Sequence, residues 1–428
     1  MDIVAILANK KIYSTTVFFI FVILLVSMAF SVRLANSISV ILLAAIVILS
    51  VHRLSFLRNA FTNIYFLSCL CFLFINILGL LYTTDPAQNI REASIKTGIA
   101  AIPFFFCANL YTIKVDMNRL MLLFTLSLVV TTLYCVLHAF FVYLQHYDSS
   151  VFFYHTLLSP FNEHAIYYSF YLLFCIIYWV EEGIAKLNSI QKKISIISIL
   201  VYFVFIIILL SSKIVLSILF LYFIYFSFYL IITKKSRKFL VATIAFIAIV
   251  FTLLLTTKNP IKNRFADMAV GTHTLFLQKK YNPGVYFNGL QFRLLTGRFT
   301  LEILSEQKAW LLGVSAGDGQ KYLRKKYIEA DMYQGDGVHN EGYLMYNCHN
   351  IYLQTSLESG MIGLFSLFFV IITLLFKIIK RKKRAALIFF LCMLVFGFTE
   401  SYLSRQFGIV LFTFMPLLAL SVSDHKSE

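Results

Sequence analysis

Residues 194–211 read ISIISILVYFVFIIILLS and residues 214–233 read IVLSILFLYFIYFSFYLIIT, and only Ser212 and Lys213 separate the two runs. About 20 helical residues, each rising 1.5 Å, cross the ~30 Å hydrocarbon core of a bilayer. Each run is therefore long and apolar enough for one membrane-spanning helix. Because almost no loop joins them, the two runs predict neighbouring helices that turn at one membrane surface.

The composition of the whole chain also indicates a membrane environment. Of its 428 residues, 60% are hydrophobic and only 13% are charged, and the mean hydropathy is +0.82. A soluble domain carries about 25% charged residues, so this chain has too few to solvate a globular surface of its size. Disordered chains are poor in apolar and aromatic residues, whereas this one has 45 Phe and 25 Tyr. A water-soluble enzyme and a disordered protein are both excluded.

Similar apolar runs recur along the chain and predict an all-α polytopic membrane protein of about twelve transmembrane helices, give or take one. The runs cover residues 13–31, 36–51, 60–82, 95–112, 120–145, 165–180, 194–211, 214–233, 239–256, 360–376, 385–399 and 406–422. The first run follows Lys10 and Lys11 and lacks a small-x-small cleavage site. We therefore expect it to be an anchor helix and not a removed signal peptide.

The distribution of basic residues predicts the orientation. With the N-terminus inside, twenty Lys and Arg residues fall in the predicted cytoplasmic segments and five in the short outer loops. This positive-inside bias places both termini in the cytoplasm. It also accounts for the net charge of +17 without a nucleic-acid partner. The basic run KIIKRKKR at 377–384 is expected to set the topology and to touch anionic lipid.

Residues 257–359 contain no spanning run, and by the parity of the spans they lie outside, in the periplasm or its equivalent. A loop of about 100 residues is far longer than an ordinary connection, and such loops are generally functional. We therefore expect four parts. These are helices 1–9 in residues 1–256, a large periplasmic loop with the catalytic motifs in 257–359, helices 10–12 in 360–422 and a cytoplasmic tail in 423–428.

Three outer positions combine a cation or a histidine with the end of an apolar helix. Lys213 lies at the membrane surface, where it either binds an anion or anchors a helix end as a snorkelling lysine. Arg293 and Arg298 are five residues apart, so one is expected to bind a ligand while the other is solvated. His349 precedes an apolar run and is either a proton acceptor or a structural histidine.

Other polar motifs predict structure and not chemistry. No Walker-type lysine follows the glycine-rich GVSAGDG at 313–319, which therefore predicts a tight turn. The 162–164 triplet Asn-Glu-His has no second histidine at matching spacing, so we expect no metal site. Six of the seven cysteines lie in apolar stretches and none has zinc-ligand spacing, so no disulfide framework is expected.

The order of these parts resembles the O-antigen ligase and O-antigen polymerase superfamily of integral membrane glycosyltransferases. The similarity is strongest between Arg293 and Gly408. Arg293 before a helix looks like the family's arginine motif, and 313–318 looks like its Gly-Val-Gly-x-Gly-Asp turn. Residues 349–363 look like its His-Asn-x-x-Leu…Glu-x-Gly-x-x-Gly signature, and 399–408 looks like a further shared stretch. Looser matches are 82–85 with Lys96, His164 with Tyr167, and 211–213.

The resemblance implies a GT-C-like fold of about twelve spans in a bacterial inner membrane, with the active side in the periplasm. It also implies the transfer of a glycan from a polyprenyl diphosphate carrier to an acceptor hydroxyl. In the ligase, which we expect here, the glycan is O-antigen and the acceptor is lipid A-core, as in lipopolysaccharide biosynthesis. The alternative within the family is a polymerase that joins lipid-linked repeats. An alternative of another class is a polysaccharide flippase or transporter, although the chain shows no inverted repeat.

The resemblance further implies roles for individual residues. Lys213 and Arg293 would stabilise the charge on the leaving diphosphate, and His349 would accept the proton of the acceptor. The implied substrate-binding positions are Arg298, Asn350, His164, Lys96, Glu400 and Arg405. Direct displacement would invert the anomeric centre. Because the carrier already holds the bond energy and the cations replace a metal, neither ATP nor another cofactor is expected.

Three positions depart from the family pattern. Lys213 stands where the family usually has arginine, which keeps the charge but loses the bidentate fork. Gly297 stands where an aromatic residue often follows the motif arginine by four, so Arg293 and Arg298 are both candidates for that arginine. Ser315 replaces a motif glycine.

Overall fold

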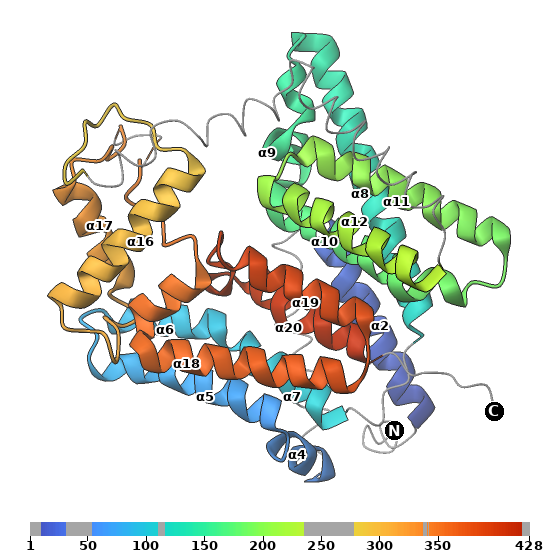
Figure 1. Ribbon diagram of the computed structural model, residues 1–428, viewed down its shortest axis with the longest axis horizontal. Helices are drawn as coiled ribbons and strands as arrows, with labels where there is room; N and C mark the ends of the chain where they lie inside the picture. Colours follow the sequence, from blue (N-terminus) through green and yellow to red (C-terminus); the bar gives the residue numbers. More distant parts are fainter. Residues whose placement is uncertain are drawn as a thin grey trace, which may run out of the picture.

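The computed structural model describes residues 10–30, 54–109, 116–234, 278–336, 340 and 342–421. These residues form an all-α structure, with no strand among them (Figure 1). The helices are α2 (Lys10–Phe30), α4 (Leu54–Phe61), α5 (Ile64–Leu78), α6 (Pro86–Lys96), α7 (Gly98–Asn109), α8 (Met117–His146), α9 (Tyr154–Leu157), α10 (Ala165–Tyr178), α11 (Ile190–Leu210), α12 (Lys213–Lys234), α16 (Gly289–Glu306), α17 (Gly319–Glu329), α18 (Ile351–Lys380), α19 (Arg384–Phe396) and α20 (Gln406–Leu420).

Within the described residues, six helical stretches are long and apolar enough to cross a membrane. They are Ile64–Leu81, Met117–His146, Ala165–Lys186, Ile190–Leu210, Lys213–Thr233 and Ile351–Lys380, and shorter apolar helices are Ser14–Phe30, Arg384–Phe396 and Gln406–Leu420. For the described residues, the prediction of an all-α protein with several helices long and apolar enough to span a membrane is confirmed. The runs predicted at 36–51 and 239–256 and both chain ends lie outside the described residues, so the total of twelve spans stays a prediction.

Polar caps, and not hydropathy, decide where several helices begin. Helix α8 begins at Met117 because the side chain of Asp116 accepts a hydrogen bond from the backbone of Arg119. Helix α18 begins well before the predicted run at 360–376 because Asn350 Oδ1 accepts from two backbone amides of its first turn, at 2.9 and 3.1 Å. The run predicted at 95–112 is divided between the end of α6 and helix α7.

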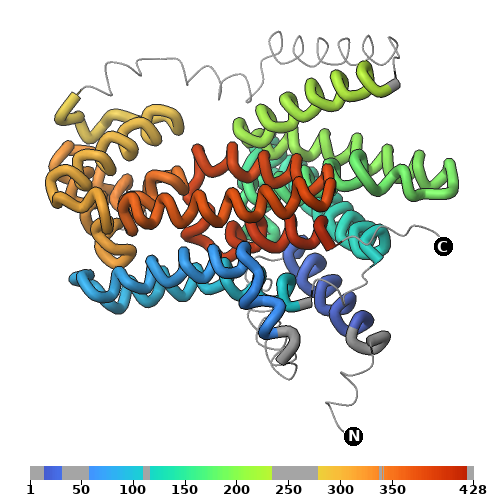
Figure 2. The backbone as a smooth tube through the Cα atoms, turned by 60° about the horizontal axis from the view of Figure 1, so that its bottom comes forward, coloured from blue at the N-terminus to red at the C-terminus, as the bar shows by residue number. Residues whose placement is uncertain are grey.

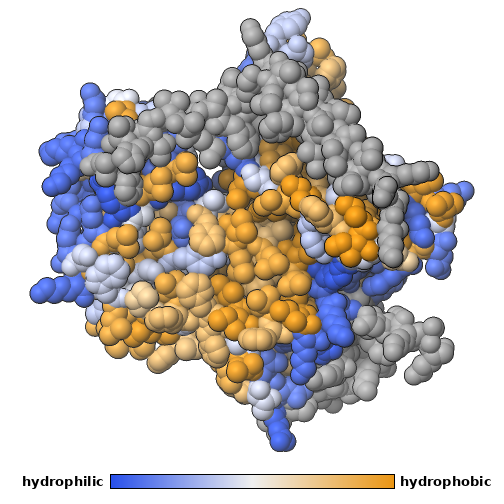
Figure 3. Space-filling model, viewed as in Figure 1, coloured by the Kyte–Doolittle hydropathy of each residue, from blue (hydrophilic) through white to orange (hydrophobic). Residues whose placement is uncertain are grey.

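Two hydrophobic cores organise the described chain. The larger one joins the apolar helices, with α18 packed along α5 and α19 along α20. The smaller one holds α16, α17 and the segment before α18 together, through residues such as Phe292, Phe299, Leu323 and Tyr327. This α16–α17 unit (residues 278–336 and 342–349) lies beyond one end of α18 and the other membrane helices (Figures 1 and 2). Figure 3 shows hydrophilic residues over the unit and apolar residues over the helices beside it.

A bend in α18 attaches the α16–α17 unit to the membrane helices. The bend is at Gly360, whose φ is +61°. The turn after α16 packs into this bend, because Val314 N donates to Leu357 O at 2.8 Å and Met361 N donates to Trp310 O at 2.8 Å. Gly313 has φ +72°, and a Cβ there would lie 2.5 Å from the carbonyl carbon of Glu358. Only glycine suits this approach, because its φ is left-handed and its backbone touches α18.

The tight turn predicted at 313–319 is present and is fastened by Asp318. Its carboxylate accepts hydrogen bonds from Thr83 Oγ1 at 3.0 Å, Thr84 N at 2.7 Å and Ser315 Oγ at 3.1 Å. Burial alone would raise the pKa of Asp318, but the hydrogen bonds from Thr84, Thr83 and Ser315 outweigh burial and lower it. These hydrogen bonds fasten the glycine-rich turn to the segment after α5, which is a structural role.

Replacing Gly313 by alanine is expected to lower thermal stability clearly, because alanine must adopt a left-handed φ, at about 1–2 kcal/mol, and must also displace α18. Gly319→Ala is the matched control in the same motif. The atoms nearest to a Cβ at Gly319 belong to the side chains of Leu357 and Glu358, at 3.6–3.7 Å, which is ordinary van der Waals contact. Melting curves of the two purified variants in detergent test this, and equal melting temperatures would contradict the account of the bend.

Candidate active site

His349 lies at the junction between the α16–α17 unit and helix α18. Its φ of 47° is left-handed, and the next residue, Asn350, caps α18. The residue before it, Cys348, is fully buried. Cys348 O accepts from Thr296 Oγ1 of α16 at 3.1 Å, and Cys348 N donates to Gln354 Oε1 of α18 at 3.1 Å. The backbone on both sides of the histidine is therefore fixed by hydrogen bonds.

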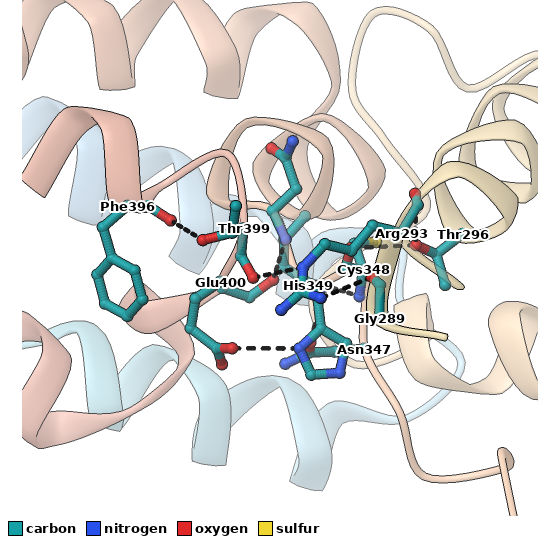
Figure 4. A network of polar contacts seen from close by, with 12 residues as sticks. Gly289, Arg293, Thr296, Asn347, Cys348, His349, Phe396, Thr399 and Glu400 are labelled. Carbon is teal, nitrogen blue, oxygen red and sulfur yellow. Dashed lines mark hydrogen bonds and ion pairs between the residues drawn. The ribbon is translucent and has the colours of Figure 1, made fainter. Parts of the chain in front are cut away.

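The imidazole of His349 pairs with the carboxylate of Glu400. Nδ1 lies 3.2 Å from Glu400 Oε2 (Figure 4). The His349 side chain is 20% exposed, while that of Glu400 is 6% exposed. Tyr167 OH of α10 donates to the other carboxylate oxygen, Oε1, at 3.4 Å. With Glu400 ionised, the proton of the neutral ring is held on Nδ1, and Nε2 carries the lone pair.

Glu400 is kept ionised by its neighbours. Burial alone would raise the pKa of its carboxyl, but the hydrogen bond and charge of His349 and the charges of Arg293 and Arg405 outweigh burial and lower it. Arg405 is exposed at the start of α20, and its guanidinium lies 5.8 Å from the ring centroid of Phe407. A buried, ionised carboxylate hydrogen-bonded to the ring can stabilise an imidazolium.

Arg293 bridges α16 and the segment that carries Glu400. Its Nε donates to Thr399 O at 2.7 Å, and its Nη1 donates to Gly289 O at 2.6 Å (Figure 4). Burial lowers the pKa of Arg293, and the charge of Glu400 opposes that shift. A guanidinium nevertheless stays charged in proteins. The structure thus places Arg293, like Arg405, in the electrostatic environment of the His349–Glu400 pair.

The structure separates the two candidate arginines. Arg298 Nε pairs with Glu302 Oε1 at 3.2 Å, and its Nη1 donates to Gln278 O at 2.7 Å. These contacts lie within the α16–α17 unit, whereas those of Arg293 reach the Glu400 segment. Arg293 is therefore the arginine that the fold brings to the histidine.

His164 lies at the start of α10, within the same electrostatic neighbourhood. Its ring centroid is 4.5 Å from that of His155 and 5.3 Å from that of Tyr167. Its Nδ1 is buried without a hydrogen-bond partner. Burial first, and then the charge of His155, lower the pKa of His164 to about 4. His164 is therefore neutral at pH 7, unlike a residue that binds an anion through charge.

The remaining predicted residues have other surroundings. Asn350 uses its side chain to cap α18, and its backbone N donates to Ser401 Oγ at 2.9 Å. Lys96 is buried, where it forms an ion pair with Glu358 and donates to Asn76 Oδ1 at 2.8 Å. Lys213 is the half-buried first residue of α12. The contacts that join His349, Glu400 and Arg293 do not involve Lys213.

Sequence reasoning missed Gln354, which supports the site, and gave Glu358 only as part of the family signature without a partner. Gln354 Nε2 donates to Glu358 Oε1 at 2.6 Å, while its Oε1 accepts from Cys348 N at 3.1 Å. Together with Lys96, these side chains form a continuous buried network from α6 to the residue before His349. The 3.6-residue period of an α-helix could have predicted this pairing, because it puts Gln354 and Glu358 on one face of α18.

The arrangement suits proton abstraction next to a developing negative charge. A histidine oriented by a carboxylate is a recognised general base, and a fixed guanidinium stabilises an anion. Among the residues that the structure describes, no group of three His, Cys, Asp or Glu side chains could hold a metal ion. The chain matches no model of a known protein family, and no curated protein sequence matches it. The family resemblance rests on the motif residues alone.

Proposed function

We propose that the protein is a membrane glycosyltransferase that transfers a glycan from a polyprenyl diphosphate carrier to an acceptor hydroxyl. In the form we propose, O-antigen ligation, the acceptor is a sugar of lipid A-core. The observation that supports it best is the 3.2 Å contact between His349 Nδ1 and Glu400 Oε2 with Arg293 beside it. This group lies where the membrane helices meet the α16–α17 unit, and we propose that a lipid-linked donor and a polar acceptor meet there.

The chemistry follows from the roles of the side chains. His349 Nε2 removes the proton of the acceptor hydroxyl, and Glu400 stabilises the imidazolium that forms. The acceptor oxygen attacks the anomeric carbon as the bond from that carbon to the diphosphate oxygen breaks. The electron pair of this bond leaves on the diphosphate, whose growing charge Arg293 stabilises, together with Lys213 as the family resemblance implies. The displacement inverts the anomeric centre and needs no ATP or metal.

The proposed location is a bacterial inner membrane, with the active side in the periplasm and both termini in the cytoplasm. The support is the ratio of twenty basic residues in the predicted inner segments to five in the short outer loops. The apolar helices hold the protein in the lipid bilayer and provide walls for the polyprenyl tail.

The lipopolysaccharide gel pattern of a deletion strain tests this function. Loss of all O-chains from core, with accumulation of carrier-linked polymer, is the result expected for a ligase. Core carrying a single repeat would instead indicate a polymerase, which uses the same donor with another lipid-linked repeat as acceptor. An unchanged pattern would contradict the proposal, and loss of carrier-linked glycan from the outer leaflet would indicate a flippase.

A further inference from the structure

One exposed aromatic side chain lies directly beside His349. Tyr346 is 47% exposed, and its ring centroid is 5.5 Å from that of His349, with 42° between the ring planes. Its other ring neighbours include Phe292, which is buried and lies 5.3 Å away. The ring therefore rests on the core of the α16–α17 unit while much of its surface stays open to solvent.

The backbone of Tyr346 is held firmly although its side chain is exposed. Its carbonyl oxygen accepts from Tyr327 OH at 3.0 Å and from Gln320 Nε2 at 3.1 Å. Its amide donates to Tyr343 O at 3.1 Å. The ring of Tyr343 is in turn stacked on Phe292 at 5.2 Å. Because this backbone is fixed and the Tyr346 ring packs against Phe292, the side chain can bind a ligand without losing much conformational entropy.

The chemistry of Tyr346 fits a sugar ring. A pyranose has an apolar face of C–H groups that packs on an aromatic ring, while its hydroxyls stay in the plane for hydrogen bonds. Tyrosine supplies a large rigid contact area with a polar tip. The diphosphate end of the donor requires cations instead, and Arg293 and Lys213 serve that purpose in the proposed reaction.

We propose that Tyr346 is the stacking platform for the acceptor sugar, placing its hydroxyl within hydrogen-bond distance of His349 Nε2. This inference rests on the proposed function and names the sugar that the site holds next to the base. A general base must come within about 2.6–3.2 Å of the atom it deprotonates. The ring centroids of Tyr346 and His349 are 5.5 Å apart, so a sugar stacked on the tyrosine would lie next to the imidazole.

Steady-state kinetics with purified variants test the platform, using polyprenyl-diphosphate-linked glycan as donor and lipid A-core as acceptor. Tyr346→Ala is expected to raise the KM for the acceptor roughly tenfold, the order expected for a lost aromatic contact, while the KM for the donor changes less than about twofold. Tyr346→Phe should restore the acceptor KM, because it keeps the aromatic face. Tyr286→Ala, at a tyrosine of the same unit that is 82% exposed, is the matched control and should behave as wild type.

The possible results distinguish a failure of the Tyr346 proposal from a failure of the glycosyltransferase proposal. An unchanged acceptor KM in an active Tyr346→Ala variant would overturn the platform and leave the glycosyltransferase proposal standing. A lower kcat with the acceptor KM unchanged would also overturn it, since that result indicates a structural role. An inactive wild-type protein would overturn both. If Tyr346→Ala does not fold, Tyr346→Leu keeps most of the volume without the aromatic face and is judged by the same criteria.

Discussion

Replacing His349 by glutamine is expected to lower the rate of glycan transfer by about 10²–10⁴-fold, the range that a positioned general base contributes. Glutamine keeps a hydrogen-bonding side chain next to Glu400 but cannot take up the proton of the acceptor. The protein should still insert and fold, because the backbone here is held through Cys348 and Asn350. The measurement is the initial rate of transfer by purified protein at saturating donor and acceptor.

Two further variants sharpen this prediction. His146→Gln, at an exposed histidine that ends α8, is the matched control and should transfer at the wild-type rate. The double variant His349→Gln with Glu400→Gln should be about as slow as His349→Gln alone, because residues that act as one unit are not additive. A near wild-type rate for His349→Gln would show that His349 is not the general base. A loss of activity in the double variant equal to the two single losses combined would show that Glu400 acts independently of the histidine.

Replacing Lys96 by methionine is expected to leave little folded protein. Lys96 and Glu358 are an ion pair whose side chains are only 4% and 3% exposed. Removing the lysine leaves a buried carboxylate without its counter-charge, which costs about 3–5 kcal/mol. That is a large part of the total stability of most proteins. The measurement is the monodisperse fraction and the melting temperature of the purified protein.

The double variant Lys96→Met with Glu358→Gln removes both charges and should recover most of the lost stability. The control is Lys325→Met, which breaks an exposed pair with Glu329 whose side chains are 68% and 49% exposed. Surface pairs of this kind contribute about 0–1 kcal/mol, so this variant should melt close to wild type. A stable Lys96→Met variant, or a double variant no better than the single one, would contradict the proposed role of the pair.

The helices could largely be predicted from the sequence because the apolar runs are long and carry few charges. The ends of the helices could not be predicted, because they depend on capping hydrogen bonds that a hydropathy profile does not contain. Asn350 starts α18 well before the predicted run, and the 95–112 run is divided after Lys96. The bend at Gly360 depends on a turn more than forty residues upstream, around Gly313, and no local pattern reveals that contact.

The candidate site was predicted in part. His349 and Arg293 could be selected because each was expected just before a helix and matches a family motif, although the structure places Arg293 inside α16. The sequence does not show that Glu400, 51 positions further along the chain, is the partner of the histidine. It also does not distinguish Arg293 from Arg298, because that choice depends on which face of α16 meets Thr399. Lys96 was grouped with the substrate-binding residues because it matches a looser position of the family pattern, whereas in the structure it pairs with the buried Glu358, which is 262 positions away.

The central claim is tested most directly by reconstitution of the full-length protein in lipid nanodiscs. The mixture contains polyprenyl-diphosphate-linked glycan and lipid A-core, with EDTA and without nucleotide, and mass spectrometry follows both lipids. The account predicts that glycosylated lipid A-core and free polyprenyl diphosphate appear in equal amounts with the wild type and fall about 10²–10⁴-fold with His349→Gln. Equal product formation by the two proteins, or release of the carrier without a glycosylated acceptor, would contradict it.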